Sequence, residues 1–284
     1  MAEKRTKGGF KPDIGTLGGI SLALAGILGG LILEKGSIRD VSQVTAALIV
    51  FGGTLGAVLV TTPFPVFLQA VKGLREVFLE RSNSAAETIE TLTKFATQAR
   101  RNGIVSLETD ADNVADPFLR KALNLAVDGT DLNEIRSMME IDIDVAEQAE
   151  EQKARVWEAA GGYSPTIGII GAVLGLIQVM KHLDDISEVG HGIAVAFVAT
   201  VYGVAVANIL FLPFSHKLRA RIQQARLLKE LMLEGIIGIV EGLNPTLIRV
   251  KLSAFNQEGP QVAPTKGRAS RSQVGMPQTV PAGD

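Results

Sequence analysis

The chain of 284 residues offers few side chains that could carry covalent or metal chemistry. It has no cysteine and only three histidines, which excludes disulfides, thiolate metal sites and a cysteine nucleophile, and argues against a histidine metal site. No P-loop, G-x-S-x-G, H-E-x-x-H or EF-hand motif occurs. Asp110, Asp112 and Asp116 form an acidic cluster, but acids in a polar segment are usually solvated. We therefore predict that the chain is not an enzyme, holds no metal and needs no cofactor.

Uncharged polar side chains in apolar surroundings form a more informative group. They are Thr166, Gln178, Thr200, Tyr202 and Asn208. Movement of protons or ions through lipid normally uses a buried ionisable residue, and the apolar segments around these side chains contain none. If the chain conducts ions, a partner must therefore supply the carboxylate. The hydroxyl of Thr200 could face such an ion, but a hydrogen bond to its own i−4 carbonyl is the simpler expectation.

Two prolines flank the same apolar segments, Pro165 near the start of one and Pro213 near the end of another. Proline is common in the first turn of a helix and just beyond a helix end, so capping is the simplest role for both. A hinge between a membrane helix and a cytoplasmic helix is the alternative. The residues alone favour capping.

The elements that position these residues are four long segments without Asp, Glu, Lys or Arg. They are segments 14–33, 41–71, 159–180 and 189–216. Each reaches the roughly 20 residues that a helix needs to cross a bilayer core of about 30 Å. The whole chain is 46% hydrophobic and only 20% charged, below the roughly 25% charge of soluble domains. Buried helices of a soluble core are the alternative, but such helices rarely stay uncharged over this length.

Lysine and arginine are distributed unevenly between the connecting segments. Segment 1–13 has four, segment 72–158 has eleven and segment 217–284 has ten, whereas connections 34–40 and 181–188 have two and one. Basic residues favour the cytoplasmic side, and an even number of spans places both chain ends on one side. Both termini and segment 72–158 are therefore predicted to be cytoplasmic. The net charge of −2 gives no sign of nucleic-acid binding.

These assignments predict an all-α membrane protein with four transmembrane helices and a large helical cytoplasmic insert between spans 2 and 3. The predicted parts are a cytoplasmic N-terminus (1–13), a transmembrane hairpin (14–62), the insert (63–162), a second transmembrane hairpin (163–213), a cytoplasmic C-terminal helical segment (214–258) and a disordered tail (259–284). Glycines four residues apart in the spans allow helix backbones to approach closely. Their number favours an oligomer.

Local signals predict two long helices within the insert. One begins at a capping box that opens with Ser84 and ends at Gly103, and the other begins at Asp131 and continues towards the third span. The acidic outer face of the second helix is predicted to be solvated. The basic side chains of segment 217–229, after the fourth span, are predicted to favour the anionic inner leaflet.

Four stretches of the chain carry a resemblance to a known family. They are S-P-T-I-G-I-I-G-A-V-L-G-L (164–176) in the third span, G-I-A-V-A-F-V-A-T-V-Y-G-V-A-V-A-N-I-L-F-L-P (192–213) in the fourth, A-L-I-V-F-G-G-T-L (47–55) in the second and R-R-N-G-I-V-S-L-E (100–108) in the insert. They resemble flagellar stator A subunits, the MotA/PomA family, which is related to TolQ/ExbB. The resemblance covers roughly residues 14–255, and several motifs in family order are more specific than a single pattern.

The resemblance implies a membrane motor. In this family a homopentameric ring of A subunits surrounds a dimer of a B-type stator subunit, which has one membrane helix, a critical aspartate and a peptidoglycan-binding domain. Ion flow past that aspartate drives rotation of the ring in the bacterial inner membrane, and the cytoplasmic insert turns the flagellar rotor switch protein. The carboxylate that this chain lacks would belong to the partner.

The resemblance also assigns roles to particular positions. Pro165 and Pro213 match two family prolines linked to coupling. Arg100 and Glu108 match a charged pair that contacts the rotor, and Arg101 shares that role. Exposed single pairs are weak, so torque would need several of them to act together.

Two further positions bear on the transported ion. Thr200 matches a polar residue near the ion path, and Ala172 falls where sodium-driven members tend to carry threonine. Because a hydroxyl there could help to coordinate Na⁺, its absence favours protons. The resemblance thus implies an ion-conducting stator subunit that converts proton flow into torque. A TolQ/ExbB-type motor for another envelope machine, usually with three spans, and a non-motor membrane scaffold are the alternatives.

Overall fold

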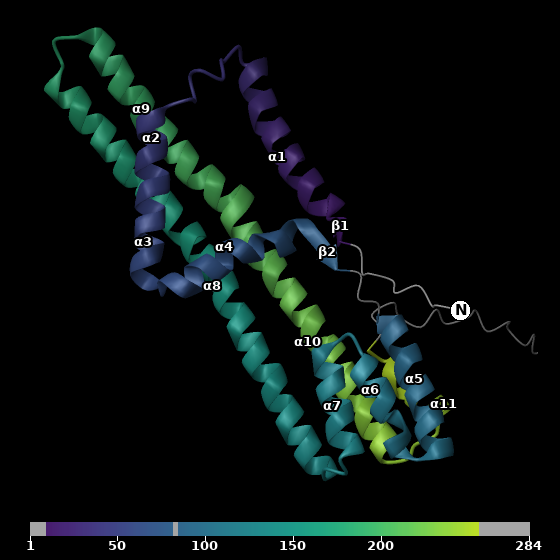
Figure 1. Ribbon diagram of the computed structural model, residues 1–284. Coiled ribbons are helices and arrows are strands. Elements are labelled where there is room, and N and C mark those ends of the chain that lie inside the picture. Colours follow the sequence, from purple (N-terminus) through teal and green to yellow (C-terminus); the bar gives the residue numbers. More distant parts are fainter. Residues whose placement is uncertain (1–9, 82–84, 256–284) are drawn as a thin grey trace, which may run out of the picture.

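The computed structural model describes residues 10–81 and 85–255, and this part of the chain is almost entirely helical (Figure 1). The predicted all-α class is confirmed. One short antiparallel pair joins β1 (Phe10–Pro12) to β2 (Leu79–Arg81). The predicted capping residue Ser84 and the predicted disordered tail, 259–284, lie outside the described residues.

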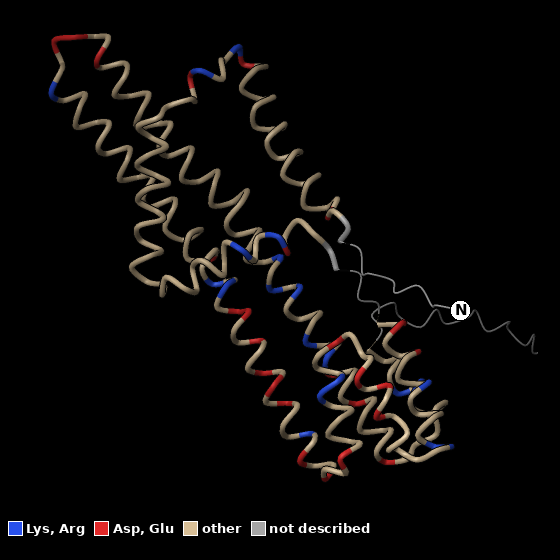
Figure 2. The backbone as a smooth tube through the Cα atoms, viewed as in Figure 1, with Lys and Arg blue, Asp and Glu red and all other residues tan. Residues whose placement is uncertain are grey.

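Four stretches of helix in the described residues are long and apolar enough to cross a membrane. They are formed by α1 (Ile14–Leu33), by α2 (Val44–Ala47), η1 (Leu48–Gly52) and α3 (Gly53–Thr61), by the outer part of α8 (Leu132–Lys181), and by α9 (Ile186–Val206), η3 (Ala207–Phe211) and the start of α10 (Leu212–Val240). Figure 2 shows charged residues at the turns at one end and in the part predicted to be cytoplasmic at the other, with uncharged helices between them. The predicted four-span architecture is confirmed.

The longest element, α8, joins the insert to the third span without a break. Its 50 residues extend about 75 Å at 1.5 Å per residue. It begins where the sequence predicts, because the Asp131 carboxylate accepts a hydrogen bond from the backbone N–H of Asn133 at 2.9 Å. After the outer turn, α9, η3 and α10 return along α8 as a second long helix (Figure 1). These two helices connect the membrane to the far end of the cytoplasmic part.

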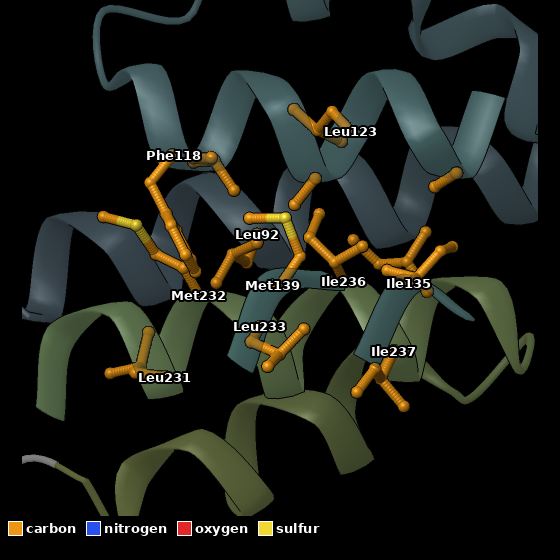
Figure 3. Packing of buried hydrophobic residues seen from close by; sticks show 14 of the residues in the cluster. Leu92, Phe118, Leu123, Ile135, Met139, Leu231, Met232, Leu233, Ile236 and Ile237 are labelled. Atoms are coloured by element: carbon orange, nitrogen blue, oxygen red, sulfur yellow. The ribbon is translucent and has the colours of Figure 1, made fainter. Parts of the chain in front are cut away.

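The bundle that is predicted to be cytoplasmic, called the cytoplasmic bundle below, packs around the inner ends of α8 and α10. Its other elements are α5 (Ala85–Asn102), η2 (Ile104–Leu107), α6 (Glu108–Asn113), α7 (Pro117–Val127) and α11 (Pro245–Ser253). Leu92, Leu123, Met139 and Ile236 come from four different helices and meet in its core without solvent exposure (Figure 3). The predicted stop at Gly103 is confirmed, since φ is +83° there, a conformation that favours glycine.

A second apolar cluster joins the spans to the bundle. It lies where α4 (Phe64–Phe78) crosses α8 and α10, and Trp157 is its largest side chain. The indole ring packs against Phe211 and Phe214, with ring centroids 5.9 and 6.1 Å away, and its N–H donates to the carbonyl of Ala70 at 3.3 Å. Aromatic packing therefore fixes the crossing point of the two long helices.

The first span stands apart from the second. Segment 14–62 is predicted to be a hairpin, but Figure 1 shows α1 separated from α2 and α3, and no residue of α1 is buried. A Cβ atom added at Gly18, Gly26 or Gly30 would meet nothing within 4 Å. The glycines of α1 therefore do not serve packing within this chain.

Candidate functional site

Within the membrane segments, α8 and α9 pack backbone against backbone. A Cβ atom at Gly203 would lie 2.6 Å from the carbonyl oxygen of Ser164, and one at Gly168 would lie 2.9 Å from the carbonyl oxygen of Ala199. One at Gly175 would meet backbone atoms of α9 at 2.8 Å. Since real Cβ atoms essentially never come this close, only glycine allows this approach. The third and fourth spans thus act as one tightly joined pair.

The two residues predicted to line an ion path lie on this pair. The hydroxyl of Thr200 donates to the carbonyl of Ala196 at 3.2 Å, which confirms the expected i−4 hydrogen bond. The backbone of Thr200 contacts Gly168, one turn of α8 before Ala172. Both Thr200 and Ala172 are half-buried. The structure places them on neighbouring helices at a similar depth, and their role in ion passage stays a prediction.

The predicted capping role is wrong for Pro165, and Pro213 does not follow a helix end as predicted but lies in the first turn of α10, which continues α9 and η3 as one helix. Pro165 lies inside α8, and Pro213 lies within the continuous helix formed by α9, η3 and α10. Proline has no backbone N–H, and its ring crowds the carbonyl four residues earlier. Just before Pro213 the helix forms a π-turn, in which the N–H of Leu212 donates to the carbonyl of Ala207. Such turns are rare and occur frequently at functional sites.

The two prolines are linked through a direct contact between the long helices. Pro165 leaves the carbonyl of Gly161 without its usual helical donor, and Pro213 follows Leu212. A Cβ atom at Gly161 would lie 2.5 Å from the Cδ2 atom of Leu212. Each helix is therefore locally weakened close to the point where it touches the other.

Replacement of Pro213 by alanine should make the protein more stable and less active. Alanine restores a backbone donor and removes the ring clash, and proline costs about 3 kcal/mol relative to alanine in a helix interior. We expect a higher unfolding temperature in detergent together with a loss of motility in the native host. Pro245→Ala is the control, because that proline occupies the first turn of α11, where it is tolerated. Unimpaired swimming of the Pro213→Ala strain would contradict the coupling role.

Ion pairs brace α8 against α10 over the whole cytoplasmic length. Near the membrane, Arg219 makes a bidentate contact with Glu158, at 2.6 and 3.0 Å, and donates to Glu151 at 2.9 Å. Further in, Arg226 pairs with Asp144, Glu147 and Glu230, and near the far end Arg136 and Lys251 pair with Glu234. The hydrogen bonds from Arg219 lower the pKa of Glu158, and Glu158 raises the pKa of Arg219. These pairs make the two helices a stiff stalk.

The stalk corrects two predictions from the sequence. The acidic face of α8, predicted to be solvated, contacts arginines of α10, and the basic segment predicted to face the inner leaflet pairs largely with acids of this chain. The pairing has a signal in the sequence. Glu151 and Glu158 are seven residues apart, as are Arg219 and Arg226, so each pair lies on one helix face. Complementary charge at this spacing could have predicted the contact.

Another site that the sequence did not predict anchors the base of α1. The Asp13 carboxylate, 8% exposed, accepts hydrogen bonds from the backbone N–H of Thr16 at 2.9 Å and from Arg221 at 2.9 Å, and pairs with Lys217 at 2.6 Å. The hydrogen bond with Lys217 is the main reason why the pKa of Asp13 lies far below its usual range. The backbone N–H of Asp13 also donates to the carbonyl of Phe78 at 2.9 Å. Asp13 therefore joins α1 to α10 through its carboxylate and to the end of α4 through its backbone N–H.

The residues predicted to face the rotor lie on the surface of the cytoplasmic bundle. Arg100 and Arg101 are in the last turn of α5, and Glu108 begins α6. All three are exposed, and within the described residues their side chains form no hydrogen bond or ion pair. Gln98 holds the segment in place, since its amide donates to the carbonyl of Ser106 at 2.9 Å and to Asp110 at 2.7 Å. The structure thus presents unpaired charges of both signs on a fixed surface.

Two family models match the chain. One, described as the MotA/TolQ/ExbB proton channel family, covers residues 110–230, and the other, described as the motility protein A N-terminal family, covers residues 17–103. Motility protein A of Helicobacter pylori is 37% identical over 87% of this chain and 96% of its own length. The chain belongs to the motility protein A family.

Solved structures agree with this membership of the motility protein A family. A C. jejuni MotAB structure is 35% identical and has a TM-score of 0.81 over 86% of this chain and 95% of its own. The flagellar MotAB stator complex from Bacillus subtilis is 35% identical, with a TM-score of 0.79 over 84% and 94%. A motility protein A of Bacillus subtilis is 34% identical over 86% of this chain and 90% of its own. The chain is thus a multi-pass inner-membrane protein with the role of a stator subunit.

Proposed function

We propose that this chain is the A subunit of a proton-driven flagellar stator, and that it forms a homopentamer around a B-type subunit. The B-type partner would have one membrane helix, a carboxylate in the membrane and a peptidoglycan-binding domain. The observation that supports this most is the combination of four charge-free spans with a stiff cytoplasmic stalk. The spans lack the ionisable residue that ion passage needs, so a partner must supply it.

The mechanism follows from the rigidity of the helix pair. An ion that passes the partner's carboxylate changes the charge beside α8 and α9, and these two helices move together because glycines lock their backbones. Pro165 and Pro213 allow the long helices to bend at the membrane surface. The ion pairs between α8 and α10 then carry the movement to the bundle. Arg100, Arg101 and Glu108 would transmit it to the flagellar rotor switch protein.

Two features support protons as the transported ion. Na⁺ needs several oxygen ligands, and Ala172 offers none where a threonine would add one. The hydroxyl of Thr200 already donates to Ala196, although its oxygen can still accept a hydrogen bond from water in the path. A proton needs only such a hydrogen-bonded chain. Both termini of the chain would lie in the cytoplasm.

A TolQ/ExbB-type motor for another envelope machine fits less well. Such motors usually have three spans, whereas this chain has four in its described residues. The match to the motility protein A N-terminal family also covers the two spans that precede the insert. A membrane scaffold without motor activity would have no use for a braced stalk that leads from the spans to unpaired surface charges.

The proposal is tested in a strain of the native host that lacks both stator subunits. Expression of this chain with its B-type partner should restore rotation, and motor speed at fixed pH should stay flat as external Na⁺ is varied. Speed should fall when the proton-motive force is collapsed. Combined Arg100→Glu and Arg101→Glu substitution is the control, since it should remove rotation while the complex still assembles and conducts. Speed that rises with Na⁺ would overturn the assignment of the ion.

A further inference from the structure

A hollow of about 360 Å³ opens at the end of the cytoplasmic bundle farthest from the membrane. It lies between the last turn of α5, the end of α7 and the end of α10, where the chain turns at Gly103, Gly129 and Gly242. Its walls are mostly apolar and include Ala96, Ala99, Ile104, Ala126, Val240 and Leu243. Its volume is at the lower end of the roughly 300–1,000 Å³ of ligand pockets, and its lining has two polar side chains, Arg100 and Thr130, which suits an apolar side chain better than a cofactor.

The rim of this hollow carries charge that has no partner within the described residues. Arg100 lines the hollow, and Arg101 follows it on the exposed end of α5. Most other cytoplasmic arginines that the structure describes pair with acids, as Arg136 and Arg226 do. Val105, in the same surface segment, is a large apolar side chain that remains 62% exposed. Apolar walls with a charged rim are the usual anatomy of a protein interface.

Two other hollows in the described residues lack this combination. One lies between α8 and α10, and its arginines are already paired with its acids. Another lies at the opposite end of α5 and α7 and has acidic side chains, including Asp110 and Asp116. Asp110 accepts a hydrogen bond from Gln98, and Asp116 caps α7, so both are engaged in the fold. Of these three hollows, the one beside Arg100 joins apolar side chains to a cation that has no ion-pair partner in the described residues.

We propose that this hollow receives an apolar side chain from a helix of the rotor protein, and that an acidic residue one turn away on that helix pairs with Arg100. The inference rests on the proposed function, in which the contact with the rotor consists of charged side chains alone. It adds the hollow, called the socket below, as a binding site for an apolar side chain. An exposed ion pair contributes little energy, whereas a side chain seated in a pocket carries much of the affinity of an interface. The hollow would supply most of the binding affinity for the rotor helix, while the charges would set the orientation of that helix.

The socket is tested by filling it in the full chain, assembled with its B-type partner. Ala99→Leu places a larger side chain in the hollow from α5, and Thr130→Leu does so from the turn before α8. We expect each to weaken binding of the intact complex to the purified rotor switch protein by about 10-fold or more, and to lower torque. Ala99→Ser, which adds little volume, should bind nearly as well as the unaltered protein.

Ala115→Leu is the matched control, because it makes the same change in the hollow at the opposite end of α7. It should leave rotor binding unchanged. Unfolding temperature and complex yield are measured for every variant, so a loss of binding counts only where the complex is intact. Normal binding by both Ala99→Leu and Thr130→Leu would overturn the socket. If the unaltered complex does not turn or bind the rotor at all, the proposed function itself fails, which is a distinguishable result.

Discussion

Replacement of Gly203 by alanine should push α8 and α9 apart and abolish motility. The added Cβ atom would lie 2.6 Å from the carbonyl oxygen of Ser164 and 3.0 Å from the Cα atom of Gly168, and these backbone atoms cannot move away by a rotamer change. Overpacking costs about 1–3 kcal/mol, and in lipid the close approach of two helices is what holds them together. We expect a lower unfolding temperature of the purified complex and no swimming.

Gly190→Ala provides the matched control for this experiment. It is the same substitution in the same helix, at a position where the added Cβ atom would meet nothing within 4 Å. Alanine is favoured over glycine in a helix by about 1 kcal/mol, so this variant should be as stable as the unaltered protein or slightly more stable. If the two variants unfold at the same temperature, backbone contact between the two helices does not hold the spans together.

Replacement of Asp13 by asparagine should release the base of α1. Asparagine keeps the size of the side chain and can still cap the helix, but it leaves Lys217 and Arg221 without their counter-charge. Loss of one partner from a buried ion pair costs about 3 kcal/mol. We expect faster hydrogen exchange along α1, whose residues have little other contact with the chain, and a lower yield of assembled complex.

The pH dependence of this anchor follows from the lowered pKa of Asp13. The carboxylate is ionised in the folded protein at every physiological pH, so its contribution is complete above about pH 4, the pKa of an unfolded aspartate. That contribution is lost progressively as the pH falls from this value through the lowered pKa of the folded state. The difference in stability between the unaltered protein and Asp13→Asn should therefore be constant from pH 5 to pH 8. Asp185→Asn, which alters a cap without an ion pair in the described residues, should show little difference at any of these values.

Local signals of the sequence predicted the four spans and, in the insert, the start of one helix and the end of another. The spans follow from composition alone, because a charge in lipid is costly whatever its neighbours are. The start of α8 at Asp131 and the end of α5 at Gly103 follow from capping groups and a positive φ, which act within one turn of helix. Helical periodicity is a local property as well, so the acidic residues of α8 could be assigned to one helix face from the sequence. Fold class and span number therefore needed no tertiary information.

Which helices and side chains contact one another could be learned only from the tertiary structure. Pro165 and Pro213 look like caps in the sequence, yet packing against a neighbouring helix keeps both helices continuous, and a helix in isolation has no such support. Asp13 and Lys217 are 204 residues apart, so no local pattern joins them. The hollow beside Arg100 is likewise made by three chain turns from distant segments.

The sequence by itself thus determined that four uncharged helices cross a membrane, and it led to the predictions that the basic segments remain on one side and that a partner supplies the carboxylate. Each of these depends on the energy of single side chains in lipid or water, which is a property of composition. Tertiary structure decided that α8 and α10 form a braced stalk, that glycines lock α8 to α9, and that Arg100, without an ion-pair partner in the described residues, lines a hollow at the end of the bundle. Those features depend on which helix faces pack together. A periodic pattern in the sequence indicates which face of a helix is apolar or charged, but not which helix lies against that face.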